Sequence, residues 1–237
     1  CFFGLEPIHE TPNYQIAFFL MTCGVIFTCY LPANIQAFMI VVSGYIEAQM
    51  LALSEELLHL YEDAKTNSAV NSVDNSSIIE DNTDVDRLVN EYIEEQLKEI
   101  IKVHARNINI LTQVQDTFSG AIVFEFSLLT GGLIAELLGG LENTYIEMPF
   151  AIMQVGMDCF IGQKVMDASL KFERAVYGCN WERFGKSNMK LVLILLQNAQ
   201  KTMRLSAGGV TTLSFSCFMS LVRSVYSAYT ALRSTMK

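Results

Sequence analysis

The sequence predicts an all-α protein, a polytopic membrane helix bundle with long cytoplasmic helical extensions. Three observations support this fold class. The composition is 51% hydrophobic and only 17% charged, whereas a soluble domain carries roughly 25% charged residues. Residues 11–46 contain no charged side chain, and a helix needs only about 20 apolar residues to cross a bilayer. Apolar side chains also recur at helical spacing along 47–63 and 84–116.

Composition excludes several classes of protein. Lys+Arg 16 against Asp+Glu 25 gives a net charge of −9, which argues against a nucleic-acid partner. The six cysteines are far apart and form no CxxC pair, so neither a zinc site nor a dense disulfide scaffold is expected. No nucleophile elbow, P-loop or dinucleotide fingerprint occurs. We therefore expect no enzyme, no cofactor and no metal. The chain begins with Cys1 rather than Met, and we expect it to be a fragment.

Four membrane helices are expected, at 14–46, 118–141, 145–165 and 205–232. Within the first, the ring of Pro32 should kink the helix because it removes a backbone hydrogen bond. The two middle segments contain acids, including Glu125 and Asp158. Taken alone, these two segments fit either membrane helices buried among other helices or a soluble helical pair.

Basic residues set the expected orientation. They are concentrated in 47–117 and 166–204, whereas 1–13 and the loop at 142–144 carry none. The positive-inside rule places both basic segments in the cytoplasm. Residues 1–13, 142–144 and the tail 233–237 are then extracellular.

The long cytoplasmic loop has three expected parts. Helices are predicted over 47–63 and 84–116, and the Ser/Asn/Asp-rich segment 64–83 between them is predicted to be a flexible linker. His104 lies on the apolar stripe of the second helix and is expected to be a packed core histidine. Glu125 is expected to hydrogen-bond to a neighbouring helix, with a proton or ion relay as the alternative.

A succession of motifs in the last third of the chain resembles a known family. Ser169–Trp181 contains the pattern Ala-x-Tyr-x-Cys-x-Trp, followed by Gln197-x-x-Gln200-Lys201 and Ala207-Gly208-Gly209. The run Val225-Tyr226-Ser227-x-Tyr229-Thr230-x-Leu232 lies close to the end. Together they resemble the C-terminal signature of the insect odorant receptor family, and Thr11–Tyr14 resembles the end of its large extracellular loop.

The resemblance implies a ligand-gated non-selective cation channel subunit that binds small volatile apolar odorants. The four helices would be helices four to seven of an expected seven. The family assembles as a heterotetramer with an odorant receptor co-receptor subunit in the plasma membrane of olfactory sensory neurons. Its last helix lines one central pore, and membrane lipid surrounds the assembly. A membrane transporter component that uses Glu125 and Asp158 as coupling groups is the alternative, with a membrane assembly factor as a third reading.

The resemblance also assigns candidate sites. The segment 186–200 would belong to the anchor between subunits, Ala207–Gly209 would separate two helix halves, and 210–232 would line the pore. The gate candidates are Tyr226, Ala228, Tyr229 and Ala231, where the two alanines depart from the bulky residues common in the family. The odorant pocket candidates are Phe18, Met21, Thr22, Val25, Met153 and Gln154, because flexible Met and aromatic side chains suit diverse apolar ligands. The subunit-anchor candidates are Leu97, Ile101, Leu191, Ile194 and Leu195.

Overall fold

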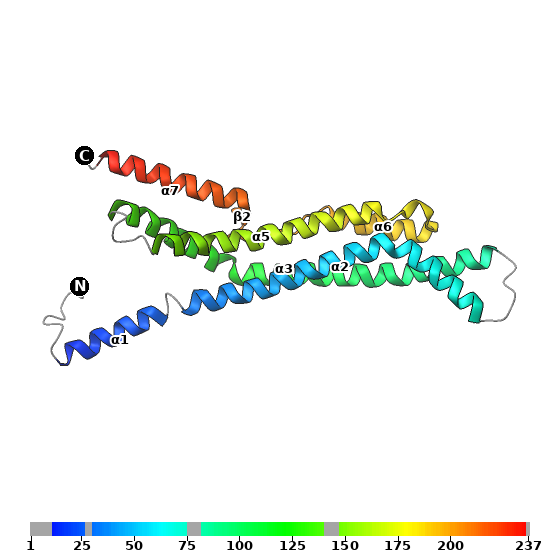
Figure 1. The fold of residues 1–237 in the computed structure, drawn as a ribbon, viewed down its shortest axis with the longest axis horizontal. Helices are drawn as coiled ribbons and strands as arrows, with labels where there is room; N and C mark the ends of the chain where they lie inside the picture. Colours follow the sequence, from blue (N-terminus) through cyan, green and yellow to red (C-terminus); the bar gives the residue numbers. More distant parts are fainter. Residues whose placement is uncertain (1–10, 27–29, 75–81, 140–146, 236–237) are drawn as a thin grey trace. The chain divides into compact units, whose positions relative to one another are not determined.

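The computed structural model describes residues 11–26, 30–74, 82–139 and 147–235. The chain divides into two compact units, Cys1–Val42 and Ser43–Lys237. Almost all described residues are helical (Figure 1), and the all-α prediction is confirmed. Two described helical segments, Ala33–Ala69 and Val85–Leu138, each contain a shorter stretch that is long and apolar enough to cross a bilayer.

The predicted membrane helix 14–46 is helical in its described parts. Helix α1 spans Asn13–Val25 and α2 spans Leu31–Asp74. The segment between them includes 27–29, which lie outside the described residues. Pro32 is the second residue of α2, and the kink expected there stays a prediction.

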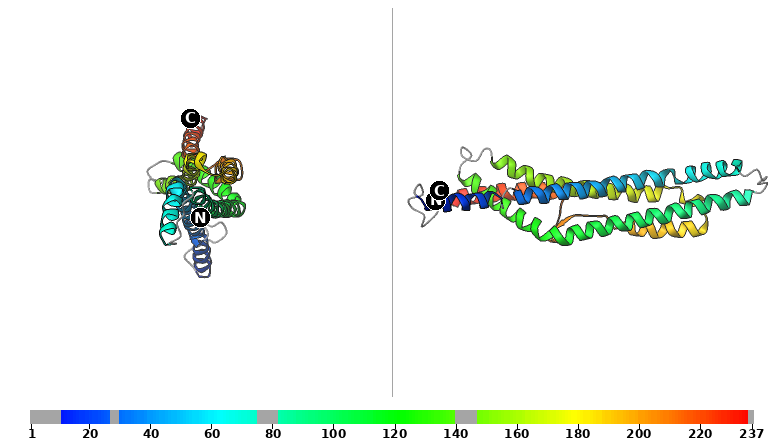
Figure 2. Two further views of the ribbon diagram at one scale, coloured as in Figure 1. Left: turned by 90° about the vertical axis from the view of Figure 1, so that its right-hand side faces the viewer. Right: turned by 90° about the horizontal axis from the view of Figure 1, so that it is seen from below.

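The second unit is built on three helices with a heptad pattern of buried side chains. These are α2 from Ser43 onward, α3 (Asn82–Gly139) and α5 (Glu147–Gly178), which run side by side in Figures 1 and 2. Alternating steps of three and four residues separate most of the buried positions, as in a coiled coil. The buried seam contains Ile46, Met50, Leu53, Leu57, Leu60 and Ala64 of α2; Val89, Ile93, Leu97, Ile100, His104, Asn107, Leu111 and Val114 of α3; and Val155, Asp158, Val165, Ser169, Phe172 and Val176 of α5.

Helix α2 continues well into the segment that was predicted to be a flexible linker. The helix ends only at Asp74, so residues 64–74 are helical. Ala64 and Ser68 extend its buried seam, and the Ser68 hydroxyl donates a hydrogen bond of 2.8 Å to the Ala64 carbonyl. Small buried residues at seam positions therefore stabilise the continuation of α2 through this segment, although its composition is typical of a linker. The remainder of the predicted linker includes 75–81, which lie outside the described residues.

Charged pairs connect α5 to α2 on the surface of this unit. Lys164 lies 3.2 Å from Glu47, and Lys171 lies 2.9 Å from Glu55. The hydrogen bond and positive charge of Lys171 lower the pKa of Glu55. Exposed pairs of this kind contribute little to stability, about 0–1 kcal/mol each, so their role is to select which faces of the two helices meet.

Helix α6 (Lys186–Ala199) returns along α3 and α5 after a tight reversal. The reversal contains the short 3-10 helix η2 (Trp181–Arg183), preceded by Asn180 in the left-handed conformation at φ 56°. The Gly185 N–H donates a 2.6 Å hydrogen bond to Oδ1 of Asn90, and Nδ2 of Asn188 donates a 2.8 Å bond to the Asn90 carbonyl. A single residue of α3, through its side chain and its backbone carbonyl, therefore fixes the start of α6.

Candidate functional site

A β-hairpin separates α6 from the last helix. Its strands are β1 (Ser206–Ala207) and β2 (Thr211–Thr212), paired antiparallel. Gly208 and Gly209 between them have φ angles of 61° and 70°, which are the positive values that a tight hairpin turn of the mirror-image type requires. The predicted continuous segment 205–232 is thus not one helix. The hairpin occupies the place where the resemblance implied a break between two helix halves.

The hairpin is seated on α3 by specific contacts. The Gly208 N–H donates to the Ser119 carbonyl at 3.3 Å, and Nε2 of Gln115 donates to the Ser206 hydroxyl at 2.7 Å. A Cβ atom on Gly208 would lie only 2.6 Å from Cγ2 of Val123. Glycine is therefore required at this position for both its backbone angle and its closeness to α3.

The last helix, α7 (Phe215–Thr235), starts in close contact with α5. The Ser214 hydroxyl accepts a 3.2 Å hydrogen bond from the Cys217 N–H, which caps the helix start. A Cβ atom on Gly162 of α5 would lie 2.4 Å from the Leu213 carbonyl oxygen, and one on Gly156 would lie 3.7 Å from the ring of Phe218. Gly162 therefore sets how closely the chain just before α7 approaches α5, whereas a Cβ atom on Gly156 would make only an ordinary van der Waals contact.

An open cavity of about 730 Å³ lies between α3, the hairpin and α7. Its wall is rich in hydroxyl groups, which can hydrogen-bond to water or to a partly dehydrated ion. These hydroxyl groups belong to Ser127, Thr130, Thr211, Thr212, Ser214, Ser216, Ser220 and Ser224. The pore segment 210–232 implied by the resemblance contains most of these residues, but Ser127 and Thr130 of α3 were not among the predicted site residues.

The four gate candidates occupy the second half of α7. Tyr226 is exposed over 66% of its surface, and Ala231 is also exposed. Ala228 and Tyr229 are half-buried. The Tyr229 hydroxyl accepts a 2.6 Å hydrogen bond from Arg233, whose guanidinium also lies 5.7 Å from the ring. Tyr226 is thus the bulky gate candidate that the described contacts leave available to line a pore, and this assignment stays a prediction.

The odorant-pocket candidates fall in different units. In the first unit, Phe18 and Met21 are exposed and the Thr22 hydroxyl bonds to the Phe18 carbonyl at 2.8 Å. The side chain of Val25 lies outside the described residues. In the second unit Met153 is exposed, whereas Nε2 of Gln154 donates a hydrogen bond to Oε1 of Glu125. Glu125 thus has the contact to a neighbouring helix that was expected of it, and the pocket itself stays a prediction.

The anchor candidates separate into buried and exposed residues. Leu97 and Leu195 are fully buried within the chain, and Ile101 and Leu191 are half-buried. Ile194 is exposed over 51% and its neighbour Leu193 over 66%. Leu193 belongs with Tyr177 and Trp181 to the wall of an apolar cavity of about 250 Å³ beside α6. Leu97 and Leu195 therefore stabilise the chain's own core, and Leu193, which sequence reasoning missed, joins Ile194 on the free face of α6.

The described residues define the class of protein before any comparison. The chain is a helical bundle with apolar stretches of membrane-spanning length. No group of three or more His, Cys, Asp or Glu side chains in the described ranges is placed to hold a metal ion. These features are those of a polytopic membrane helix bundle.

The comparisons with known proteins then give the family. Residues 1–138 and 144–226 match the 7tm Odorant receptor family, and the chain belongs to that family. It is 24% identical over 143 residues to Odorant receptor 67c of Drosophila melanogaster, a match that covers 57% of this chain and 35% of that relative. It is 23% identical over 148 residues to the Odorant receptor coreceptor of Anopheles gambiae, covering 57% of this chain and 30% of the relative.

A solved structure shares the fold. The insect olfactory receptor OR5 of Machilis hrabei, determined in complex with eugenol, superposes with a TM-score of 0.74 at 11% sequence identity. The match covers 96% of this chain and 55% of the other. This chain therefore spans only about a third of the two curated relatives and about half of the solved receptor. Its family confirms the resemblance found in the sequence, and members of this family are receptors rather than enzymes.

Proposed function

We propose that this chain is the C-terminal membrane part of an odorant receptor subunit, and that the subunit is a ligand-gated non-selective cation channel. The observation that carries the proposal is the family match along residues 1–138 and 144–226. The hydroxyl-rich cavity beside α7 supports the finer statement that the ion path runs along this helix. The subunit assembles with the odorant receptor co-receptor as a heterotetramer, and lipid of the neuronal plasma membrane surrounds it.

The ligand is a small volatile apolar molecule. The OR5 structure that shares this fold was solved with eugenol, a small aromatic compound. In this chain, Phe18, Met21 and Met153 are exposed apolar side chains that suit such a ligand. The transporter alternative gains no support, because the Glu125 carboxylate is hydrogen-bonded to Gln154 rather than left as an unpaired relay group.

The experiment tests whether the hydroxyl-rich cavity belongs to the ion path. Ser224 is an exposed residue of α7 in the cavity wall. The Ser224→Cys variant is made with Cys217→Ser, because Cys217 lines the same cavity and would also react. The receptor and co-receptor are expressed together, and odorant-evoked current is measured before and after a charged, thiol-specific methanethiosulfonate reagent.

We expect the reagent to remove most of the current in Ser224→Cys, since a charged adduct obstructs a narrow aqueous path. The matched control is Phe124→Cys on α3, which is also exposed but lies outside the cavity wall. Its current should not change. Equal inhibition of the two variants, or none in either, would refute the assignment of the ion path to this face of α7.

A further inference from the structure

A second cavity, smaller and apolar, lies between α3, α5 and α7. Its volume is about 180 Å³. Its floor is formed by Leu133, Val155 and Val225, one from each helix, which are 3%, 0% and 6% exposed. Among the described residues that line it, Tyr226 is the only one with a polar side-chain atom. The cavity is thus built from three separate helices around a buried apolar floor.

The size and lining of this cavity define what it can hold. A buried water needs two to four polar partners, and a wall of Leu, Ile, Val, Met and Phe side chains offers none. In another protein, an engineered apolar cavity of about 150 Å³ stays dry and binds benzene or xenon. The present cavity is of the same order, and it can take up only a small part of a lipid acyl chain.

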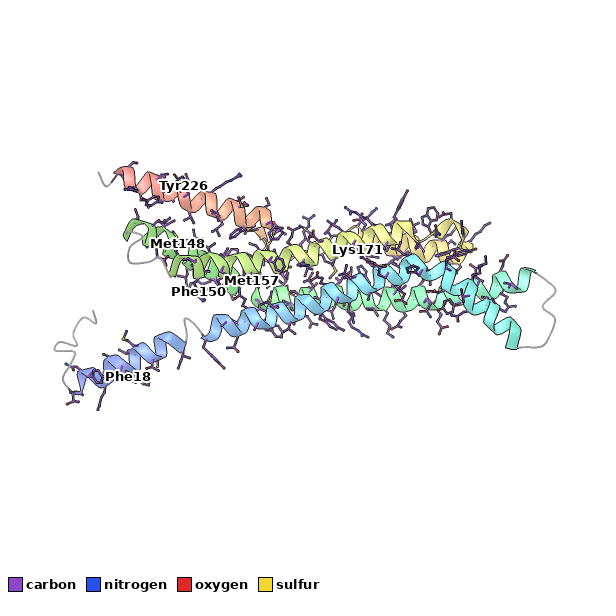
Figure 3. The ribbon with its side chains drawn as sticks, in the orientation of Figure 1. Phe18, Met148, Phe150, Met157, Lys171 and Tyr226 are labelled. Atoms are coloured by element: carbon purple, nitrogen blue, oxygen red, sulfur yellow. The ribbon has the colours of Figure 1, made fainter. Side chains whose placement is uncertain are left out.

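The cavity is distinct from the predicted odorant pocket. Met148, Ile152 and Val155 project into it from positions i, i+4 and i+7 of α5, which share one face of a helix. The pocket candidate Met153 does not line it and is 60% exposed. In Figure 3, Met148 on α5 lies opposite Tyr226 on α7. The two candidate sites therefore use different faces of α5.

We propose that this cavity is a binding site for a compact apolar molecule of benzene or toluene size. Because five α7 residues, including Val225 and Tyr226, line it, an occupant holds α7 against α3 and α5. A ligand favours the arrangement to which it binds best, so occupancy stabilises the present position of α7. Binding at this cavity does not depend on the proposed channel function. Only an effect of the bound molecule on ion current would rest on that proposal.

The experiment maps binding directly with 3-trifluoromethyl-3-phenyldiazirine, a compact apolar photoreactive probe that carries one phenyl ring. The full-length receptor is labelled in membranes, and adducts are located by mass spectrometry with and without excess toluene. We expect toluene-protected adducts on the α3, α5 and α7 residues that line the cavity. The probe is larger than toluene, so protection by excess toluene is the decisive readout. Because this measurement needs no current, its failure is distinguishable from failure of the channel proposal.

Three variants make the test specific. Ile152→Trp fills the cavity and should reduce the protected adducts several-fold, whereas Leu128→Trp, at an exposed position of α3 outside the cavity wall, should leave the yield unchanged. Val155→Ala enlarges the floor and should admit a naphthyl diazirine that the parent protein excludes. Equal yields in all variants, adducts confined to exposed side chains, or protection by palmitate but not by toluene would overturn the proposal.

Discussion

At the residue scale, the polar side chains in the heptad seam of α3 are the most informative. His104 is 3% exposed and Asn107 is fully buried, one turn apart. The His104 ring stacks on Phe172 of α5 with a centroid distance of 4.7 Å. Neither its ring nitrogens nor the side-chain atoms of Asn107 have a hydrogen-bond partner among the described residues. Polar residues at seam positions cost stability while specifying register, and the stacking of His104 on Phe172 ties one of them to α5.

Burial gives His104 a defined pH dependence. It lowers the pKa of His104 below its usual 6.5, so below pH 6.5 the unfolded chain binds more protons than the folded one. Stability therefore falls as the pH drops from about 6.5 toward the folded-state pKa. We expect His104→Leu to remove this part of the pH dependence of the thermal midpoint, because a leucine side chain does not titrate and fits a position already packed on Phe172.

The control for this prediction is His59→Leu, at an exposed position of α2. Thermal midpoints of the membrane protein in detergent are compared at several values between pH 7 and pH 5. If the slope in His104→Leu equals that of the parent chain, the buried histidine does not account for the acid sensitivity of the fold.

The same seam shows how far the sequence could be read. The predicted apolar stripe of 84–116 agrees with the structure at His104, which is buried. Leu88 is exposed although it is apolar. Val89 and Ile93 are buried instead. From the sequence alone, either Leu88 or the pair Val89 and Ile93 could be assigned to the buried face, because apolar residues occur on both sides of it. Only the packing of α3 on its neighbours selects between them, and that information is not local.

At the element scale, the hairpin of β1 and β2 is the feature that the sequence did not predict. Its strands are two residues long, too short for an alternating pattern to be recognised. The Gly208-Gly209 pair was noticed, but only as a break in a helix. Its actual role depends on the Ser119 carbonyl and the Gln115 side chain of α3, which lie far away in the sequence.

Substitution of the two turn glycines, Gly208 and Gly209, by alanine should destabilise the protein to different extents. Both have a positive φ angle, but only Gly208 approaches α3, whereas a Cβ atom on Gly209 would meet nothing within 4 Å. Gly209→Ala should therefore cost about 1 kcal/mol of stability from backbone strain alone. Gly208→Ala adds a clash with Val123 and should cost roughly 1–3 kcal/mol more.

Thermal unfolding of the two variants, measured side by side, separates the two effects. The double variant Gly208→Ala with Val123→Ala is the internal control, because it removes the clashing methyl group and should recover part of the lost stability. Equal destabilisation by the two single substitutions would mean that the contact with α3 contributes nothing.

At the scale of the whole molecule, the free face of α6 is the surface best suited to hold subunits together. Leu193 and Ile194 are exposed there, and Tyr177 and Trp181 continue the apolar surface from the end of α5 and η2. Exposed apolar area costs roughly 25 cal/mol per Å² when it remains in water. This segment was predicted to be cytoplasmic, where no lipid can cover it, so a neighbouring subunit is the natural partner.

We therefore expect Leu193→Glu to dissociate the receptor complex without preventing insertion of the chain into the membrane. A charge at the centre of an apolar interface cannot be solvated once the subunits meet. The matched control is Asn198→Glu, an exposed polar position on the same helix, which should leave the complex intact. Leu97→Glu should behave differently from both, because Leu97 is buried within the chain and its substitution unfolds the subunit itself.

Size-exclusion chromatography of the solubilised complex distinguishes these outcomes: folded single subunits for Leu193→Glu, the parent complex for Asn198→Glu, and aggregated or degraded chain for Leu97→Glu. An intact complex in Leu193→Glu would show that the subunits meet through another surface.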